Sequence, residues 1–124
     1  MLSVGFDIGS SSIKCAIIDT DKNAIIAGGF YPRDEMKISS LKSGWAEQDP
    51  NVWWENAKIL FTQLTSENKI DKSAIKSIGI SYQMHGLVLV DKDGQVIRPS
   101  IIWCDSRAVE IGNKAFDALG HNYC

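Results

Sequence analysis

The segment from Val4 to Ile18 constrains the fold more than any other part of the chain. It contains two apolar runs, Val4–Asp7 and Ile13–Ile18, which are separated by the sequence Gly-Ser-Ser-Ser. Short apolar runs on either side of a glycine- and serine-rich turn are typical of two neighbouring strands. The segment therefore predicts a strand–turn–strand unit, and Asp7 ends its first strand.

The turn of this unit has the composition of a phosphate-binding loop. Gly9 allows backbone N–H groups to approach a polyphosphate closely because it has no side chain, and Ser10 and Ser11 add hydroxyl donors. Asp7 could ligate Mg²⁺, which prefers oxygen ligands and usually keeps several waters, so that one carboxylate is enough. Lys14 could add a positive charge or simply point to solvent. A plain hairpin with a polar turn stays open as the alternative, since neither GxxxxGK[ST] nor GxGxxG is present.

The rest of the chain predicts a mixed α/β domain. The run Ala24–Tyr31 completes an antiparallel meander, and residues 32–44 form a polar loop. Asp49 and Pro50 suit the N-cap and first turn of a helix that ends near Ser66-Glu67-Asn68. The later elements predicted are a buried strand at Ile75–Tyr82, a hairpin from Leu87–Val90 and Gln95–Ile97, a short apolar run at Ile101–Trp103 and a last helix at about Ala108–Leu119. This order differs from a simple Rossmann alternation.

Composition and charge exclude several classes of function. The 124 residues correspond to about one domain, and the net charge of -2 does not suggest binding to nucleic acid or to an anionic membrane. No apolar run approaches the roughly 20 residues that span a bilayer. The N-terminus has neither a basic region nor a cleavage site, so we expect no signal peptide and a cytoplasmic location. Cys15, Cys104 and Cys124 are widely spaced and odd in number, which favours reduced thiols over disulfides or a zinc site.

A second candidate site follows the predicted strand at residues 75–82. Gln83 and His85 can both donate and accept hydrogen bonds, which suits a polyol, and Met84 is an adaptable apolar side chain. The ends of strands in open α/β sheets are common places for ligand contacts. A strand-end histidine that is satisfied by the backbone is the alternative.

A third cluster lies around Asp105, in the sequence Trp-Cys-Asp-Ser-Arg. Asp105 could accept hydrogen bonds from sugar hydroxyls while Arg107 orients it, or Asp105 or Ser106 could only cap the last helix. Trp45 and Trp53 could pack as a staple-like pair across the start of the first helix, or Trp45 could form an apolar wall for a sugar.

Taken together, these segments resemble the FGGY family of carbohydrate kinases. The run DIGSSSIK at residues 7–14 looks like the first phosphate motif of that family. GWAEQDP at 44–50, QMHG at 83–86 and IIWCDSRA at 101–108 occur in the family's order, and the match extends from Val4 to about Ala108. Within the family, QMHG combined with WxDxR is most similar to xylulokinases.

The resemblance implies a ribonuclease H-like, actin-like ATPase fold. Full enzymes of the family have two such domains, with ATP and the sugar in the cleft between them, and residues 1–124 would form the N-terminal part of the first domain. The implied cofactors are ATP and Mg²⁺. Asp7 would be the catalytic carboxylate that acts through Mg²⁺, and the phosphates would be bound by Gly9, Ser10, Ser11 and Lys14.

The same resemblance assigns the sugar to Gln83, Met84, His85 and Asp105. Cys104 stands where xylulokinases often have asparagine, and this departure leaves the sugar open. D-Xylulose, converted to xylulose 5-phosphate, is the leading substrate, with gluconate and ribulose as alternatives. The partners implied are ATP and a small-molecule sugar, without nucleic acid or membrane, and a homodimer is one arrangement for a full-length parent.

The catalytic base of the family is an aspartate well downstream of the motifs present here. We therefore expect the 124-residue chain to be inactive alone. Two other classes of function are a non-catalytic actin-like module that holds nucleotide or sugar, and a phosphatase or nuclease of the ribonuclease H type. The latter needs several clustered carboxylates, of which only Asp7 is clear from the sequence.

Overall fold

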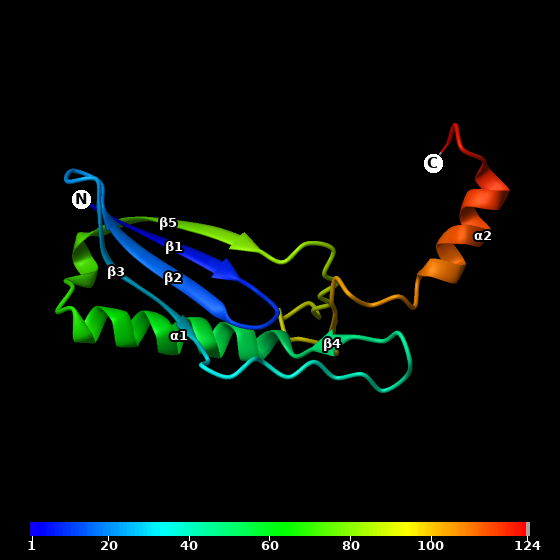
Figure 1. Ribbon diagram of the computed structural model, residues 1–124, viewed down its shortest axis with the longest axis horizontal. Coiled ribbons are helices and arrows are strands. Elements are labelled where there is room, and N and C mark those ends of the chain that lie inside the picture. The colour runs from blue at the N-terminus through cyan, green and yellow to red at the C-terminus, as the bar shows by residue number, and fades with distance from the viewer. Residues whose placement is uncertain (124) are drawn as a thin grey trace.

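The computed structural model describes residues 1–123 as a four-stranded sheet with one long helix packed against one face (Figure 1). The strands of this sheet are β1 (Leu2–Ile8), β2 (Ile13–Asp19), β3 (Ala24–Tyr31) and β5 (Ile75–Tyr82). β1, β2 and β3 form the predicted antiparallel meander, and β5 adds parallel to β1, giving the order β3-β2-β1-β5. Because β1 and β5 run in the same direction, their carboxyl ends lie at one edge of the sheet.

The helix α1 (Pro50–Glu67) begins and ends as the sequence predicts. The Asp49 carboxylate accepts a hydrogen bond of 2.9 Å from the backbone N–H of Asn51, and Pro50 occupies the first turn, where a missing N–H has no cost. Asn68 caps the other end. The helix packs on β1, β2 and β3 over a buried apolar core formed by Val4, Ile13, Cys15, Ile17, Ala27, Met36, Ala57, Leu60 and Leu64. Burying one large aliphatic side chain in this way stabilises the fold by about 1.5–3 kcal/mol.

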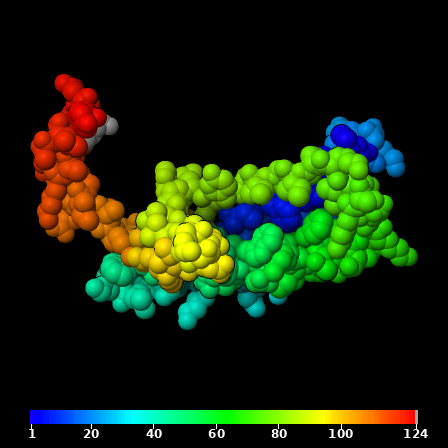
Figure 2. All heavy atoms as spheres, turned by 180° about the vertical axis from the view of Figure 1, so that it is seen from behind, coloured from blue at the N-terminus to red at the C-terminus, as the bar shows by residue number. Residues whose placement is uncertain are grey.

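α1 leaves β5 uncovered, so the prediction that this strand is buried is wrong. Ile78 and Ile80 lie opposite Val4 and Phe6 in the parallel register and so face the helix side of the sheet, yet they are 66% and 65% exposed. An apolar groove of about 520 Å³ separates β5 from α1. Figure 2 shows β1 at the floor of this groove. The sequence pattern marks β5 as apolar, but burial depends on a second element that packs over it.

The remaining elements near the sheet are short. A 3-10 helix, η1 (Lys72–Ala74), precedes β5, and β4 (Glu47–Gln48) pairs antiparallel with β6 (Ser100–Ile101). The predicted hairpin is present in a short form: Val90 and Val96 form an antiparallel bridge, the Ile97 N–H donates to the Leu89 carbonyl, and the Asp91 N–H donates to the Gln95 carbonyl.

The second helix, α2 (Val109–Leu119), extends away from the sheet, and none of its residues is buried (Figure 1). Its N-cap residue is Ala108, which makes no side-chain cap hydrogen bond, so the expectation that Asp105 or Ser106 caps this helix is wrong. Within residues 1–123, no helix has the length and apolar character needed to cross a membrane. Cys15 is a buried free thiol and Cys104 an exposed one, whereas Cys124 lies outside the described residues.

Candidate functional site

Asp7 lies at the carboxyl end of β1, between two polar neighbours on the flanking strands. Lys14 of β2 donates to Asp7 Oδ2 over 3.0 Å, and Ser81 of β5 donates to Oδ1 over 3.1 Å. Both contacts follow from the register, which places Asp7 opposite Lys14 on one side and opposite Ser81 on the other. The hydrogen bond from Lys14, helped by that from Ser81, holds the pKa of Asp7 below its usual value. The carboxylate is therefore ionised at neutral pH, and its side chain is 45% exposed.

The loop after Asp7 is a tight turn that requires glycine. The Gly9 N–H donates to the Ser12 carbonyl over 3.1 Å. A Cβ atom added at Gly9 would lie 2.8 Å from the same oxygen, which is closer than real Cβ contacts. Since the Gly9 N–H is used inside the turn, a phosphate would meet the amides and hydroxyls that follow it. The Ser11 carbonyl accepts a bond of 2.8 Å from the Met36 N–H, which ties the loop to the segment after β3.

Ser10 is held by two segments that are distant in the sequence. The Gln48 amide nitrogen donates to the Ser10 carbonyl over 2.6 Å, and the Trp103 indole N–H donates to the Ser10 hydroxyl over 3.2 Å. Gln48 is buried, and its oxygen accepts a bond of 3.1 Å from the Trp53 indole. The loop is therefore fixed by tertiary contacts, unlike the turn of an isolated hairpin.

Residues 83–85 lie beside the end of β1, because the Gln83 N–H donates to the Ile8 carbonyl over 2.9 Å. The side-chain amide of Gln83 is buried, and neither of its polar atoms has a hydrogen-bond partner within residues 1–123. His85 has a φ of 58°, a left-handed conformation that is uncommon for residues other than glycine, and Met84 is 66% exposed. Strained backbone and unpaired buried polar groups cluster at ligand sites, so this turn is a candidate binding element.

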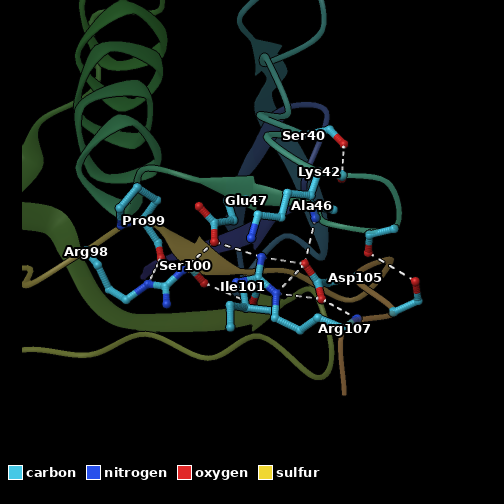
Figure 3. A network of polar contacts seen from close by, with 12 residues as sticks. Ser40, Lys42, Ala46, Glu47, Arg98, Pro99, Ser100, Ile101, Asp105 and Arg107 are labelled. Atoms are coloured by element: carbon cyan, nitrogen blue, oxygen red, sulfur yellow. Dashed lines mark hydrogen bonds and ion pairs between the residues drawn. The ribbon is translucent and has the colours of Figure 1, made fainter. Parts of the chain in front are cut away.

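Asp105 belongs to a network of ion pairs that joins β4 to the segment after β6 (Figure 3). Its Oδ2 atom accepts from the Ala46 N–H over 2.6 Å, and Arg107 donates to both carboxylate oxygens over 2.7–3.0 Å. These bonds, those of Arg107 above all, hold the pKa of Asp105 far below its usual range. The pairing of Arg107 with Asp105 is present as predicted. Both Asp105 oxygens already accept bonds from the protein, and the side chain is only 2% exposed. The contact of Asp105 with a sugar stays a prediction.

The same network includes Glu47, which pairs with both Arg98 and Arg107. Its distance to Arg107 is 2.7 Å, and the Arg107 guanidinium lies 3.7 Å from the centre of the Trp45 ring. Trp45 therefore stacks on an arginine, whereas Trp53 donates to Gln48. These contacts, in place of the predicted staple, are what fix the two tryptophans.

Three residues of this region were not found from the sequence as site residues: Ser81, Gln48 and Trp103. Ser81 reaches Asp7 through the parallel pairing of β1 with β5, which no local pattern shows. Gln48 and Trp103 lie in the motifs GWAEQDP and IIWCDSRA, but their hydrogen bonds to Ser10 depend on the fold.

The position of Asp7 suits a carboxylate that acts as the one protein ligand of a Mg²⁺ ion. It is an ionised, half-exposed carboxylate next to a loop rich in hydroxyls, and Mg²⁺ usually keeps several of its waters. Within residues 1–123, no three His, Cys, Asp or Glu side chains come together as a group that could hold a metal.

Comparison with known proteins places this architecture in a defined class. The structure superimposes on a xyloylose kinase from Brucella ovis with a TM-score of 0.80 and 33% identity, covering 96% of this chain and 25% of that one. A gluconate kinase from Lactobacillus acidophilus gives a TM-score of 0.81 and 27% identity over 94% of this chain and 22% of the other. The xylulose kinase of Staphylococcus epidermidis is 36% identical over 104 residues, which are 84% of this chain and 20% of that protein.

The fold is thus the mixed α/β fold of the actin-like ATPases, in the form found in carbohydrate kinases. The N-terminal domain of the FGGY family of carbohydrate kinases matches residues 2–122, and the chain belongs to this family. The family and fold predicted from the sequence motifs are confirmed. The chain spans about a fifth of the length of the curated relatives that it matches, 20% in the case of the Staphylococcus epidermidis protein.

Proposed function

We propose that this chain forms the phosphate- and sugar-binding part of an ATP-dependent kinase that converts D-xylulose to xylulose 5-phosphate. The observation that carries the proposal is the meeting of two candidate sites at one edge of the sheet. Asp7 and the loop at 9–12 follow β1, and the Gln83 N–H binds the Ile8 carbonyl and brings residues 83–85 beside them. The most similar relatives whose names give a substrate include several xylulose kinases.

The phosphate half of the site would bind ATP with Mg²⁺. Asp7 would hold the Mg²⁺ ion, which neutralises charge on the phosphates, and Ser81 keeps the carboxylate in place. Gly9 permits close approach of the backbone, and the hydroxyls of Ser10 and Ser11 donate hydrogen bonds to phosphate oxygens. Lys14 adds a positive charge 3.0 Å from Asp7.

The sugar half would use residues 83–85. The buried amide of Gln83 and the imidazole of His85 offer both donors and acceptors to sugar hydroxyls, and Met84 contributes an apolar contact. Asp105, oriented by Arg107, would bind a further hydroxyl only where that hydroxyl takes the place of one of its present donors, such as the Ala46 N–H. The sugar's terminal 5-hydroxyl would receive the γ-phosphoryl group, and its proton would need an acceptor.

None of the acids assigned here is a suitable proton acceptor. Asp7 is assigned to the metal, and its pKa is already below the usual value. Asp105 is paired with Arg107, which holds the pKa of Asp105 below its usual value and makes this carboxylate a poor base. We therefore propose that residues 1–124 act as the N-terminal part of the first kinase domain and do not transfer phosphate alone. Sugar-stimulated ADP production by the purified chain, above that of an Asp7→Ala control, would contradict this.

Gluconate is the second candidate substrate, because a gluconate kinase has the same fold over 94% of this chain. Titration with D-xylulose and with gluconate separates the two. We expect D-xylulose to shift the NMR signals of the Met84 methyl group and the His85 imidazole at lower concentration than gluconate does. The reverse order would replace xylulose by gluconate in the proposal.

A further inference from the structure

We infer that Gln48 and Trp103 are positioning residues for the phosphate loop, and that they hold Ser10 so that its hydroxyl proton is free for a phosphate oxygen. This inference rests on the proposed phosphate-binding role of the loop. The two residues come from different parts of the chain, 38 and 93 positions from Ser10.

The first step is the direction of the bond between Trp103 and Ser10. An indole N–H can only donate, so the Ser10 oxygen must be the acceptor in the 3.2 Å contact. A serine hydroxyl that accepts through its oxygen still has its own proton to donate. Trp103 therefore leaves Ser10 as a donor, which is the role that an anionic phosphate oxygen requires.

The second step is the orientation of the Gln48 amide. The Trp53 indole N–H also can only donate, and it lies 3.1 Å from the Gln48 oxygen. This contact fixes which end of the amide is oxygen, so the nitrogen end points to the Ser10 carbonyl at 2.6 Å. Gln48 is only 4% exposed, so water has little access to its amide as a competing hydrogen-bond partner.

The third step links this arrangement to the neighbouring segment. Leu87, just after residues 83–86, exchanges two backbone hydrogen bonds with Ile101, which lies two residues before Trp103. The chain that carries the candidate sugar residues is thus joined through Ile101 to the residue that orients Ser10. A sugar bound at residues 83–85 would lie next to a loop in which Ser10 is already ordered. Binding of a phosphate to that loop would then cost less conformational entropy.

The test is a titration of the ¹⁵N-labelled chain with Mg²⁺ and inorganic tripolyphosphate. Trp103→Phe keeps an aromatic side chain but removes the N–H donor together with part of the ring, and Trp54→Phe is the matched control that loses the same atoms at a similarly exposed tryptophan (55% and 64% exposed). We expect the dissociation constant for tripolyphosphate to rise about 2–10-fold in Trp103→Phe, the effect of one hydrogen bond, and to be unchanged in Trp54→Phe.

A second readout separates positioning from a merely structural role. When Ser10 donates to an anion, its oxygen becomes a better acceptor, so the Trp103 indole N–H resonance should move downfield on titration while that of Trp54 stays fixed. Equal affinity in the wild type and Trp103→Phe, with a static Trp103 signal, would overturn the inference alone. Failure of the wild type to bind tripolyphosphate would overturn both the inference and the phosphate-binding role of the loop.

Discussion

β2 and β5 belong to the same sheet and carry isoleucines on the same face, yet their surroundings are opposite. Ile13 and Ile17 of β2 are fully buried under α1, whereas Ile78 and Ile80 of β5 are 66% and 65% exposed. The difference comes from α1, which packs against β2 and β3 and leaves β5 at the edge of the sheet. Similar strand sequences therefore contribute very differently to stability.

A second contrast lies in the interactions that hold the covered region around β2 and the polar region around β6. Residues near β2 are held by apolar packing, whereas the segment around β6 is held by the ion pairs of Glu47, Asp105 and Arg107. Apolar packing is insensitive to pH, whereas carboxylate–guanidinium pairs are lost when the carboxylate is protonated. The two regions should therefore respond to different perturbations.

The largest expected effect is at the core of the covered region. Ile17→Ala should lower the free energy of unfolding by about 2–5 kcal/mol, because it opens a cavity under α1. Ile80→Ala, the same change on the uncovered strand, should alter it by no more than about 0.5 kcal/mol. Urea unfolding of both variants measures the difference. Equal losses would mean that β5 is covered in solution, and the contrast between the strands would fail.

A smaller effect is expected at the proposed phosphate loop, residues 9–12. Gly9→Ala should cost about 1–3 kcal/mol and weaken tripolyphosphate binding, since its Cβ would lie 2.8 Å from the Ser12 carbonyl. Gly79→Ala on β5 is the control, because no atom lies within 4 Å of the added Cβ. Alanine there should be neutral or stabilising by roughly 0.5–1 kcal/mol, the cost of glycine inside a strand. Urea unfolding and phosphate titration of both variants would show whether the loop is as tight as described.

The smallest expected effect is a pH dependence of the free energy of unfolding, which should come from the polar region around Asp105 and not from the apolar core. The pKa of Asp105 is lower in the folded chain than in the unfolded one, so its ionised form stabilises the fold. This contribution is complete well above the unfolded pKa of about 3.9 and is lost as the pH falls toward the folded value. Asp105→Asn should therefore destabilise the chain at pH 7, and the gap from the wild type should narrow as the pH falls.

The control for this experiment is Glu110→Gln on α2, which breaks an exposed pair with Lys114. Exposed pairs of this kind contribute little, so this variant should follow the wild type at every pH. Urea unfolding from pH 7 to pH 2 gives the comparison. A gap between Asp105→Asn and the wild type that is constant with pH would show that the carboxylate contributes by shape and not by charge.

Local features of the fold were predictable because they depend on residues that are close in sequence. The three strands of the meander, the Asp49 cap of α1 and the glycine turn at Gly9 follow from periodicity, capping and turn chemistry. The exposure of β5 and the cap of α2 were predicted wrongly. Burial depends on which element packs over a strand, and the N-cap position is Ala108, whose side chain cannot accept a hydrogen bond.

The sequence by itself determined the family, through the order of its four motifs, and it predicts which residues face the proposed phosphate. Only the tertiary structure decided how these residues are held. Ser81 reaches Asp7 across 74 positions, and Trp103 reaches Ser10 across 93, through strand register and chain packing. Such contacts depend on the free energy of the whole fold, in which each pairing competes with many others, and no local pattern of residues specifies them.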